Sequence, residues 1–375
     1  MPIVVREVDT PYDLKTFIHL PETIHKNHPQ WVHPLYMDDK SFFDKRKNKS
    51  FQTSETILCL AWDGHKAVGR IMGIINTRYN LQRSESNARF CFLECYNDFS
   101  IAESLIQSIS RWASDKGMTH LIGPLGFSDK EPQGMLIEGF EQEVVIATNY
   151  NFPWLPDFLQ KLGFSKEVDL VSYLLPVDNP ASSRIAAIAN RALVGNSFQL
   201  LNFSSRKELR PWVVPIFRLI NEAYVNIYGF VALEEYEMQE YARRYLPILD
   251  PRFVKVVLDA EEKLAAFVVS MPEISAGIRK ARGRILPFGW YHILKAGKKT
   301  TLLTLLLGGI ADRHRGKGLD AILSASLQSA ARQAGLTVID SHLILETNRL
   351  MRAECERHHG VLHKRYRVFR KGLMG

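Results

Sequence analysis

The order of predicted secondary structure is repeated along this chain of 375 residues, and no other feature of the sequence limits the possible folds as strongly. Each half is predicted to contain strands, a helix, a strand, a second helix and a closing strand. The main segments of the first half are residues 57–62, 67–76, 89–96, 101–116, 120–122, 155–162 and 169–175. Those of the second half are residues 198–203, 208–225, 234–246, 253–259, 263–270, 301–310, 319–334, 338–345, 350–358 and 361–370. An internal duplication of one α/β unit is the simplest explanation.

The chain length supports two domains, because a single hydrophobic core rarely serves more than about 250–300 residues. We predict an N-terminal domain at residues 1–178, a linker at 179–197 that holds a short helix, and a C-terminal domain at 198–375. The fold class is α/β (α+β), with a mixed central sheet flanked by helices in each domain. Asp63 and Gly64 lie between two apolar runs, which predicts a β-hairpin.

Composition excludes several classes of protein. The chain is 46% hydrophobic and 23% charged, as in ordinary globular proteins. It has no run of the roughly 18 to 20 apolar residues needed to cross a bilayer and no signal-peptide pattern, so we predict a cytoplasmic location. The four cysteines form no CxxC pair, so buried free thiols are favoured over a disulfide or a zinc site. They are Cys59, Cys91, Cys95 and Cys355.

Positive charge is concentrated in the second half. The net charge is +8, and no acidic residue occurs between Glu273 and Asp312, whereas seven lysines and arginines do. Such an excess favours an anionic partner, which could be nucleic acid, a phosphate-bearing ligand or a membrane surface. No RNP, helix-turn-helix or zinc-finger pattern is present, so we predict no nucleic-acid partner.

Residues 309–318 form the sharpest local motif, Gly-Ile-Ala-Asp-Arg-His-Arg-Gly-Lys-Gly. They lie between a predicted buried strand and an amphipathic helix. Glycines at this position allow a phosphate to approach the main chain at the positive end of the helix dipole. The spacing is neither that of a Walker loop nor G-x-G-x-x-G. The alternative is a flexible helix start with solvated arginines.

The core of this motif, Arg313-x-x-Gly316-x-Gly318, resembles the acyl-CoA-binding motif R-x-x-G-x-G of the GNAT superfamily. This resemblance implies a tandem GNAT-like fold and acyl-CoA as co-substrate. The first half has no glycine at the matching position, residues 97–100, and is predicted not to hold CoA. The cofactor-binding residues implied by the motif are Ile310, Arg313, His314, Arg315, Gly316, Lys317 and Gly318.

The whole chain resembles a bacterial family typified by YghO, whose members carry two GNAT-like halves. The resemblance implies an N-acyltransferase, possibly one that joins a long acyl chain to a lipid-like sphingoid amine. Two alternatives stay open: acetylation of a small amine, and acyl-CoA binding without catalysis by a regulatory protein. The matching segments are residues 70–76, 90–94, 123–124, 127–128, 134–140, 150–151, 162–164, 345–348 and 364–367.

Direct attack of an amine on a thioester needs a general base, and we predict Glu346 in this role, with Asn348 orienting it. The alternative for Glu346 is a favourable interaction with the dipole of the following helix. In many GNAT enzymes a tyrosine serves as general acid, but the matching position here is Cys355, so the acid is unassigned.

Polar residues in a glycine-rich segment of the first half are the candidates for binding the amine acceptor, whether small or lipid-like. The alternative is that glycines and prolines merely shape a long loop here. The candidates are Ser128, Asp129, Glu138, Tyr150 and Asn151.

Residues 285–295 combine large apolar and aromatic side chains with flanking cations. This composition suits peripheral contact with a membrane surface, but a buried core with a basic rim is the favoured interpretation. His358, His359 and His363 lack a carboxylate at ligand spacing, so no metal is predicted. The sequence does not indicate an oligomeric state.

Overall fold

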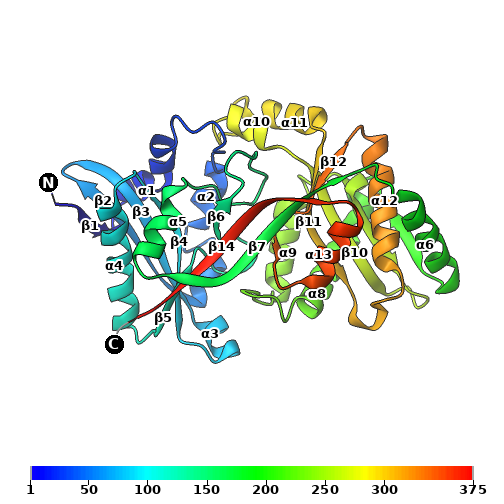
Figure 1. Cartoon of the computed structure of the whole chain (residues 1–375), viewed down its shortest axis with the longest axis horizontal. Helices are drawn as coiled ribbons and strands as arrows, with labels where there is room; N and C mark the ends of the chain where they lie inside the picture. Colours follow the sequence, from blue (N-terminus) through cyan, green and yellow to red (C-terminus); the bar gives the residue numbers. More distant parts are fainter. Residues whose placement is uncertain (1, 374–375) are drawn as a thin grey trace. The chain divides into compact units, whose positions relative to one another are not determined.

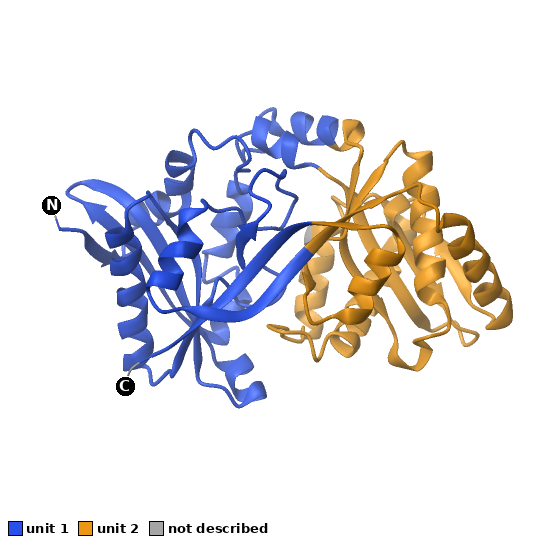
Figure 2. Ribbon diagram, in the orientation of Figure 1, with its two compact units in different colours: residues 1–171, 274–296, 363–375 blue, residues 172–273, 297–362 orange. Residues whose placement is uncertain are grey.

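The structure, a computed structural model, describes residues 2–373, apart from the side chain of residue 244. The chain forms two compact units (Figure 1; Figure 2). Unit 1 comprises residues 1–171, 274–296 and 363–375, and unit 2 comprises residues 172–273 and 297–362. The predicted domains at 1–178 and 198–375 are consecutive stretches of sequence, and that division stays a prediction. The compact units are instead assembled from separate stretches.

The sheet of unit 1 begins as an antiparallel meander of β1 (Val4–Glu7), β2 (Ser54–Asp63), β3 (Lys66–Asn76) and β4 (Asn87–Cys95). The predicted hairpin is confirmed, because Gly64 has a φ of 58° in the turn that joins β2 to β3. β4 then pairs in parallel with β5 (His120–Gly123). Next to β5 lies β14 (Val361–Gly372), whose last residues pair with β5, and β6 (Met135–Glu138) pairs with β14.

Helices cover both faces of this sheet. α4 (Phe99–Asp115) forms the crossover between β4 and β5, and its buried residues Ile101, Leu105 and Ile109 follow the predicted helical spacing. α5 (Trp154–Lys161) packs in the same hydrophobic cluster. A second cluster, built around Phe17, contains residues of α1 (Pro11–Ile24) and α2 (Tyr36–Phe42). The other short elements of this part of the chain are a 3-10 helix at Lys49–Gln52 and α3 (Thr77–Arg83).

The sheet of unit 2 repeats this topology. β8 (Gln199–Asn202), β9 (Val254–Leu258), β10 (Leu264–Pro272) and β11 (Leu302–Ile310) form an antiparallel meander. The crossover helix α12 (Leu319–Gln333) leads to β12 (Val338–Asp340), which pairs in parallel with β11. The predicted duplication of one α/β unit therefore holds for the strand order and for the crossover.

Helices also cover both faces of the second sheet. α8 (Val213–Ala223) packs on the sheet through Leu219 and Ile220. α12 contacts β9, β10 and β11, and α6 (Ser182–Gly195) packs on α12. The remaining elements are α7 (Arg206–Leu209), α9 (Glu235–Tyr245), β13 (Ile344–Leu345), α13 (Arg349–Arg357) and 3-10 helices at Arg210–Trp212, Pro251–Phe253 and Asp312–His314.

The closing strands differ from the predicted arrangement. Residues 169–175 were expected to complete the first sheet and residues 361–370 the second. In the structure, β5 of unit 1 pairs with residues 369–372 of β14. In unit 2, β12 pairs with residues 174–176 at the end of β7 (Ser165–Pro176). The closing strands are thus exchanged, which accounts for part of the discontinuity in sequence. Residues 274–296, which belong to unit 1 and interrupt unit 2, account for the rest.

The interpretation of residues 285–295 as buried core is wrong. α11 (Gly289–Lys299) begins within this region, and α10 (Ser275–Lys280) precedes it. They approach closely at Gly277, where an added Cβ would lie 2.6 Å from the Cα of Ile293 and 2.8 Å from the Cβ of Ala296. The smaller face of α11 thus makes the packing contact. The larger apolar side chains of this segment are exposed.

Candidate functional site

The loop of residues 311–318 joins β11 to α12 in unit 2. It begins with the 3-10 helix at Asp312–His314 and ends with Gly316 and Gly318, whose φ angles are 75° and 82°. Both values lie in the left-handed region, which glycine adopts at little cost. A Cβ at Gly318 would lie 2.8 Å from the Cβ of Ala192 in α6, whereas a Cβ at Gly316 would meet nothing within 4 Å. Gly318 therefore permits helix packing, and Gly316 leaves the loop backbone open.

The N-terminus of α12 has chemistry suited to an anion. Gly318 occupies the N-cap position, so no side chain caps the helix. The first amides of a helix have no partner within the helix, and the helix dipole adds partial positive charge there. Arg313, Arg315 and Lys317 in the preceding loop are all exposed. This combination can bind phosphate groups.

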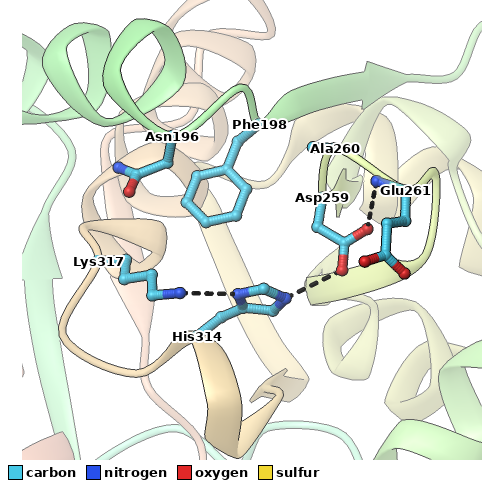
Figure 3. A pocket seen from close by; sticks show the side chains of 7 residues that line it. All are labelled: Asn196, Phe198, Asp259, Ala260, Glu261, His314 and Lys317. Atoms are coloured by element: carbon cyan, nitrogen blue, oxygen red, sulfur yellow. Dashed lines mark hydrogen bonds and ion pairs between the residues drawn. The ribbon is translucent and has the colours of Figure 1, made fainter.

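Asp259, in the turn between β9 and β10, contacts this loop through His314 (Figure 3). His314 Nε2 lies 3.0 Å from Asp259 Oδ2, and Arg313 Nη2 lies 3.4 Å from the same oxygen. Lys317 Nζ lies 3.5 Å from His314 Nδ1. Burial acts to raise the pKa of Asp259, but hydrogen bonds from the Lys263 amide and from His314 outweigh it and lower the pKa to about 2. The carboxylate is therefore ionised at neutral pH and holds the cationic loop in place.

Two cavities flank the loop. The first, of about 160 Å3, is lined by Asn196, Phe198, Asp259, Ala260, Glu261, His314 and Lys317 (Figure 3). It is smaller than ordinary ligand pockets of about 300–1,000 Å3, and it lies beside the contact between Asp259 and the loop. The second, of about 430 Å3, is lined by Ala181, Arg184, Ile185 and Ile188 around α6 and by Arg357 and His359. It combines apolar surface with cations and lies near Gly318, because Ile188 would be 3.6 Å from a Cβ at that glycine.

The pairing of β11 with its two neighbouring strands becomes irregular before the loop. It pairs with β12 only over Leu302–Thr304. On its other side, the pairing with β10 shifts register between Val269 and Ser270, so Leu306 has no opposite residue and forms a bulge. Farther along, the Tyr224 hydroxyl donates to the Gly308 carbonyl at 2.8 Å. The bulge lies close in sequence to the loop of residues 311–318, hereafter the glycine loop.

The predicted catalytic residues follow β13 in the same unit. Glu346 is half-buried, and its backbone carbonyl accepts a hydrogen bond of 3.0 Å from Arg352 Nη1. Arg352 Nε in turn donates to the Tyr173 hydroxyl at 3.2 Å. Asn348 is exposed, and its side chain accepts from the Met351 amide at 3.1 Å as the N-cap of α13. Asn348 therefore caps α13, and its catalytic role stays a prediction.

Cys355 replaces the tyrosine expected from the GNAT pattern, and its thiol is buried. Burial raises the pKa of this thiol to about 12, and Glu354 and Glu356 add to the increase. It is therefore a neutral thiol without access to a substrate. The other three cysteines are buried too, which confirms the prediction of buried free thiols.

The five acceptor candidates lie in unit 1. The Ser128 amide donates to Glu131 Oε2 at 2.7 Å, and Asp129 pairs with Lys130 at 3.0 Å. Glu138 lies on β6 and pairs with Arg365 of β14 at 3.2 Å.

The other two candidates hold the backbone around β6. The Tyr150 hydroxyl donates to the Phe140 carbonyl. Asn151 is 5% exposed, and its amide makes hydrogen bonds of 2.7 and 3.1 Å with the backbone N and O of Leu136. Each of the five candidates thus makes a hydrogen bond or an ion pair within unit 1, and its role in acceptor binding stays a prediction.

Comparisons with known proteins place the chain among relatives. No protein-family model matches it. It is 25% identical to "Bacterial ceramide synthase" of Caulobacter vibrioides, with 98% of this chain and 96% of the relative covered. It is 24% identical to "Protein YghO" of Escherichia coli, with 96% and 93% covered. The structure superposes on the tandem GNAT protein from the clavulanic acid biosynthesis pathway with a TM-score of 0.57 and 13% identity, over 100% of this chain and 99% of that one. The chain is a YghO relative with a tandem GNAT fold.

The predicted fold and the resemblance to YghO-like proteins are thereby confirmed. Which residues of this YghO relative bind ligands stays a prediction. Sequence reasoning missed Asp259, Tyr224 and Arg184, which the fold brings close to the glycine loop or to β11. Each lies far from residue 318 in sequence and in no motif, so only tertiary structure could reveal it.

Two searches of the described residues gave no candidates. Residues 2–373 contain no group of three or more histidine, cysteine, aspartate or glutamate side chains arranged to hold a metal ion. Within the same residues, every helix is too short or too polar to span a bilayer. His358, one of the three histidines considered for a metal, is buried and pairs with Glu354 at 3.1 Å, so the expectation that it lacks a carboxylate at such spacing is wrong. It also contacts Ser324 at 2.9 Å and Gln328 at 3.0 Å on α12.

Proposed function

We propose that this chain is an acyl-CoA-dependent N-acyltransferase that transfers a long acyl chain from the thioester to a lipid-like amine. The class of reaction is favoured by its GNAT fold and by its relationship to a bacterial ceramide synthase over nearly the full length of both chains. Ceramide formation joins a fatty acyl group to a sphingoid amine, so a long-chain amino alcohol is the acceptor that we favour.

The glycine loop at the start of α12 is the observation that carries this proposal. Gly316 and Gly318 adopt left-handed conformations, and the helix behind them has no side-chain cap. Exposed cations from Arg313, Arg315 and Lys317 surround the same point. The pyrophosphate of CoA carries the negative charge that this arrangement favours. We propose that the amides of residues 313–318 bind it and that Ile310, at the end of β11, contacts the adjoining pantetheine arm.

The proposed reaction is a direct transfer without a covalent enzyme intermediate. The neutral amine nitrogen attacks the thioester carbonyl carbon, and a C–N bond forms. The tetrahedral intermediate then collapses, the C–S bond breaks, and CoA leaves as a thiolate. One proton is lost from the nitrogen, and the thiolate takes up one proton, so the products are an amide and CoA.

Glu346 is the proposed base for this step. It follows β13, and its backbone is held by Arg352, so its position is fixed by the fold. Asn348 begins the next helix, where it can orient Glu346 or simply cap α13. Cys355 is buried as a neutral thiol and is not the proton donor to the leaving group in this scheme. Protonation of the thiolate by water is sufficient, because a thiol has a pKa near 8.5.

Turnover assays with purified protein test the proposal. Palmitoyl-CoA and acetyl-CoA are each supplied with a long-chain amino alcohol and with a soluble primary amine, and both free CoA thiol and amide product are measured. We expect the highest kcat/KM for palmitoyl-CoA with the amino alcohol. A preference for acetyl-CoA with the soluble amine would refute the lipid acceptor but keep the acyltransferase.

Ligand binding distinguishes an enzyme from a regulatory protein. Acyl-CoA at about 100 times its Kd raises the free energy of unfolding by roughly 2.7 kcal/mol. A thermal shift of this size without any amide product would favour a regulatory protein, and the absence of both would refute the proposed function.

A further inference from the structure

Five large apolar side chains are exposed close together in sequence at α11. They are Leu286 (76% exposed), Phe288 (73%), Trp290 (48%), Tyr291 (51%) and Leu294 (58%). Single exposed apolar residues are ordinary on protein surfaces, but a cluster of this kind marks a binding surface.

The two faces of α11 have opposite roles. At 100° per residue, His292, Ile293 and Ala296 lie on one side of the helix, and these three residues are the ones that meet Gly277 of α10. Trp290, Tyr291 and Leu294 lie on the opposite side, together with Lys298. The packing on α10 therefore directs the aromatic side chains outward.

This exposed surface has a fixed backbone. The Trp290 amide donates to the Ile285 carbonyl at 2.9 Å, and the Trp290 indole N–H donates to the Pro287 carbonyl at 3.0 Å. Arg284 anchors the preceding turn through Glu22 of α1, at 3.0 Å. Because the indole N–H is already satisfied, the ring can present its apolar surface without an unpaired donor.

Cations border the apolar side chains. Lys295 lies over the ring of Tyr291, 5.6 Å from its centroid, and Lys298 and Lys299 form the last turn of α11. All three lysines are exposed, as are Lys280 and Arg282 before the helix. No acidic residue occurs between Glu273 and Asp312 in the sequence, so negative side chains of the segment itself do not offset this charge.

We propose that α11 and the turn before it dock this chain on an anionic lipid surface. The segment is a short amphipathic helix with aromatic and leucine side chains on one face and lysines at its border, which is the pattern of helices that lie in the membrane interface. Lysines near the surface attract anionic headgroups, while Phe288, Trp290 and Leu294 enter the boundary of the acyl chains. Charge complementarity favours this occupant over a second copy of the chain, because the same cations would then face one another. The inference does not depend on the proposed reaction.

Sedimentation with lipid vesicles tests this proposal on the full-length chain. We expect binding to vesicles of phosphatidylcholine mixed with phosphatidylglycerol and at least tenfold weaker binding to vesicles of phosphatidylcholine alone. The triple variant Lys295→Glu/Lys298→Glu/Lys299→Glu should bind the anionic vesicles about a hundredfold more weakly, since each lysine near the surface contributes about a fivefold effect. The double variant Phe288→Ser/Leu294→Ser should lose about tenfold or more.

Matched variants control for total charge and for total exposed apolar surface. Lys45→Glu/Lys47→Glu/Lys49→Glu changes the net charge equally at another exposed lysine cluster, and Val194→Ser/Leu350→Ser removes two other exposed apolar side chains. Both controls should bind anionic vesicles as the wild type does. Circular dichroism confirms that all variants are folded.

A second readout places Trp290 itself at the lipid. Brominated acyl chains should quench part of the tryptophan fluorescence of the wild type, and Trp290→Phe should remove that quenching. Equal binding to both kinds of vesicle, or equal loss in the α11 variants and their controls, would overturn the proposal. So would self-association of the wild type that Phe288→Ser/Leu294→Ser abolishes, because the surface would then belong to a second copy.

Discussion

The connection between the central strand and the crossover helix differs between the two units, although the strand order around it is the same. In unit 1, residues 96–98 join β4 to α4, whereas in unit 2, residues 311–318 join β11 to α12. Both central strands carry a bulge at a similar distance before this connection, near Phe92 in β4 and at Leu306 in β11. The duplicated fold has therefore kept the strand geometry and changed the loop.

This change reverses the preference of the helix N-terminus for anions. In unit 1, Asp98 caps α4, and its carboxylate accepts from the Ser100 amide at 2.9 Å and from the Ser100 hydroxyl at 2.8 Å. A negative side chain thus occupies the position that a phosphate would need. In unit 2, Gly318 leaves the N-terminus of α12 without a side-chain cap. The N-terminus of α4 is therefore expected to repel anions, whereas the N-terminus of α12 is expected to attract them.

Substituting Gly316 should produce the largest effect. Gly316→Val forces a β-branched residue into a φ of 75°, although a Cβ there would meet no atom within 4 Å. The loop must therefore change its backbone conformation while the packing around it stays intact. We expect the thermal shift with palmitoyl-CoA to disappear and turnover to fall below detection.

Asp98→Ala is the matched control in the other loop. It removes a helix cap and should lower the free energy of unfolding by about 1 kcal/mol, while the thermal shift with palmitoyl-CoA is unchanged. The inference that only the loop of unit 2 binds CoA would be contradicted if Asp98→Ala abolished the thermal shift or if Gly316→Val preserved it.

A carboxylate from each unit provides the next test. Glu346→Gln removes the proposed base and should reduce kcat about 100-fold or more without weakening acyl-CoA binding, because general-base catalysis contributes about 10²–10⁴-fold. Glu55→Gln in unit 1 disrupts a surface pair with Lys116 and should leave kcat within a few-fold of the wild type. Steady-state kinetics and the palmitoyl-CoA thermal shift measure both effects. Equal losses of kcat would show that catalysis is not restricted to unit 2.

Local sequence patterns predicted the elements that form the core. The helix expected at residues 101–116 is α4 (Phe99–Asp115), and the strand expected at 301–310 is β11 (Leu302–Ile310). Apolar spacing determines such elements because each must bury one face. The loop around Gly316 and Gly318 could also be predicted from sequence. Both residues adopt left-handed conformations, which favour glycine over other residue types.

Pairings between distant segments could not be predicted in the same way. Residues 174–176 and 369–372 both belong to closing strands, and nothing in their sequences distinguishes the sheet that each one completes. The contact of Asp259 with His314 likewise depends on where the turn after β9 lies in the folded unit. The outward orientation of Trp290 depends on the absence of a side chain at Gly277. Each is a property of tertiary packing that periodicity does not encode.

Two asparagines among the predicted site residues should differ in their effect on stability. Asn151 is buried and bonds to both backbone groups of Leu136, so Asn151→Ala should lower the free energy of unfolding by about 2–3 kcal/mol. Asn348 is an exposed cap of α13, so Asn348→Ala should cost only about 1 kcal/mol. Urea denaturation measures both values. If Asn151→Ala leaves stability unchanged but raises KM for the acceptor, Asn151 acts in binding instead.

The smallest expected effect concerns Asp259, a carboxylate that contacts the loop of unit 2, whereas in unit 1 Asp98 caps the helix itself. Its pKa of about 2 in the folded chain is below the ordinary value of about 3.9 for aspartate, so its ionised form stabilises the fold. That stabilisation is complete above about pH 4 and is lost as the pH falls toward 2. The Asp259→Asn variant should therefore be less stable than the wild type at pH 7, by up to about 1 kcal/mol as for other partly exposed ion pairs.

The difference between Asp259→Asn and the wild type should shrink as the pH falls from about 4 to 2, because the wild-type carboxyl then becomes neutral too. Thermal unfolding at several pH values measures this change. Palmitoyl-CoA affinity at neutral pH should fall only a few-fold in the variant, since Asp259 positions His314 and Arg313 without itself facing an anion. A stability difference that persists unchanged at pH 2 would show that packing, and not the charge of Asp259, holds the loop. Tighter binding by the variant would show that the carboxylate repels the ligand, as Asp98 is expected to do in unit 1.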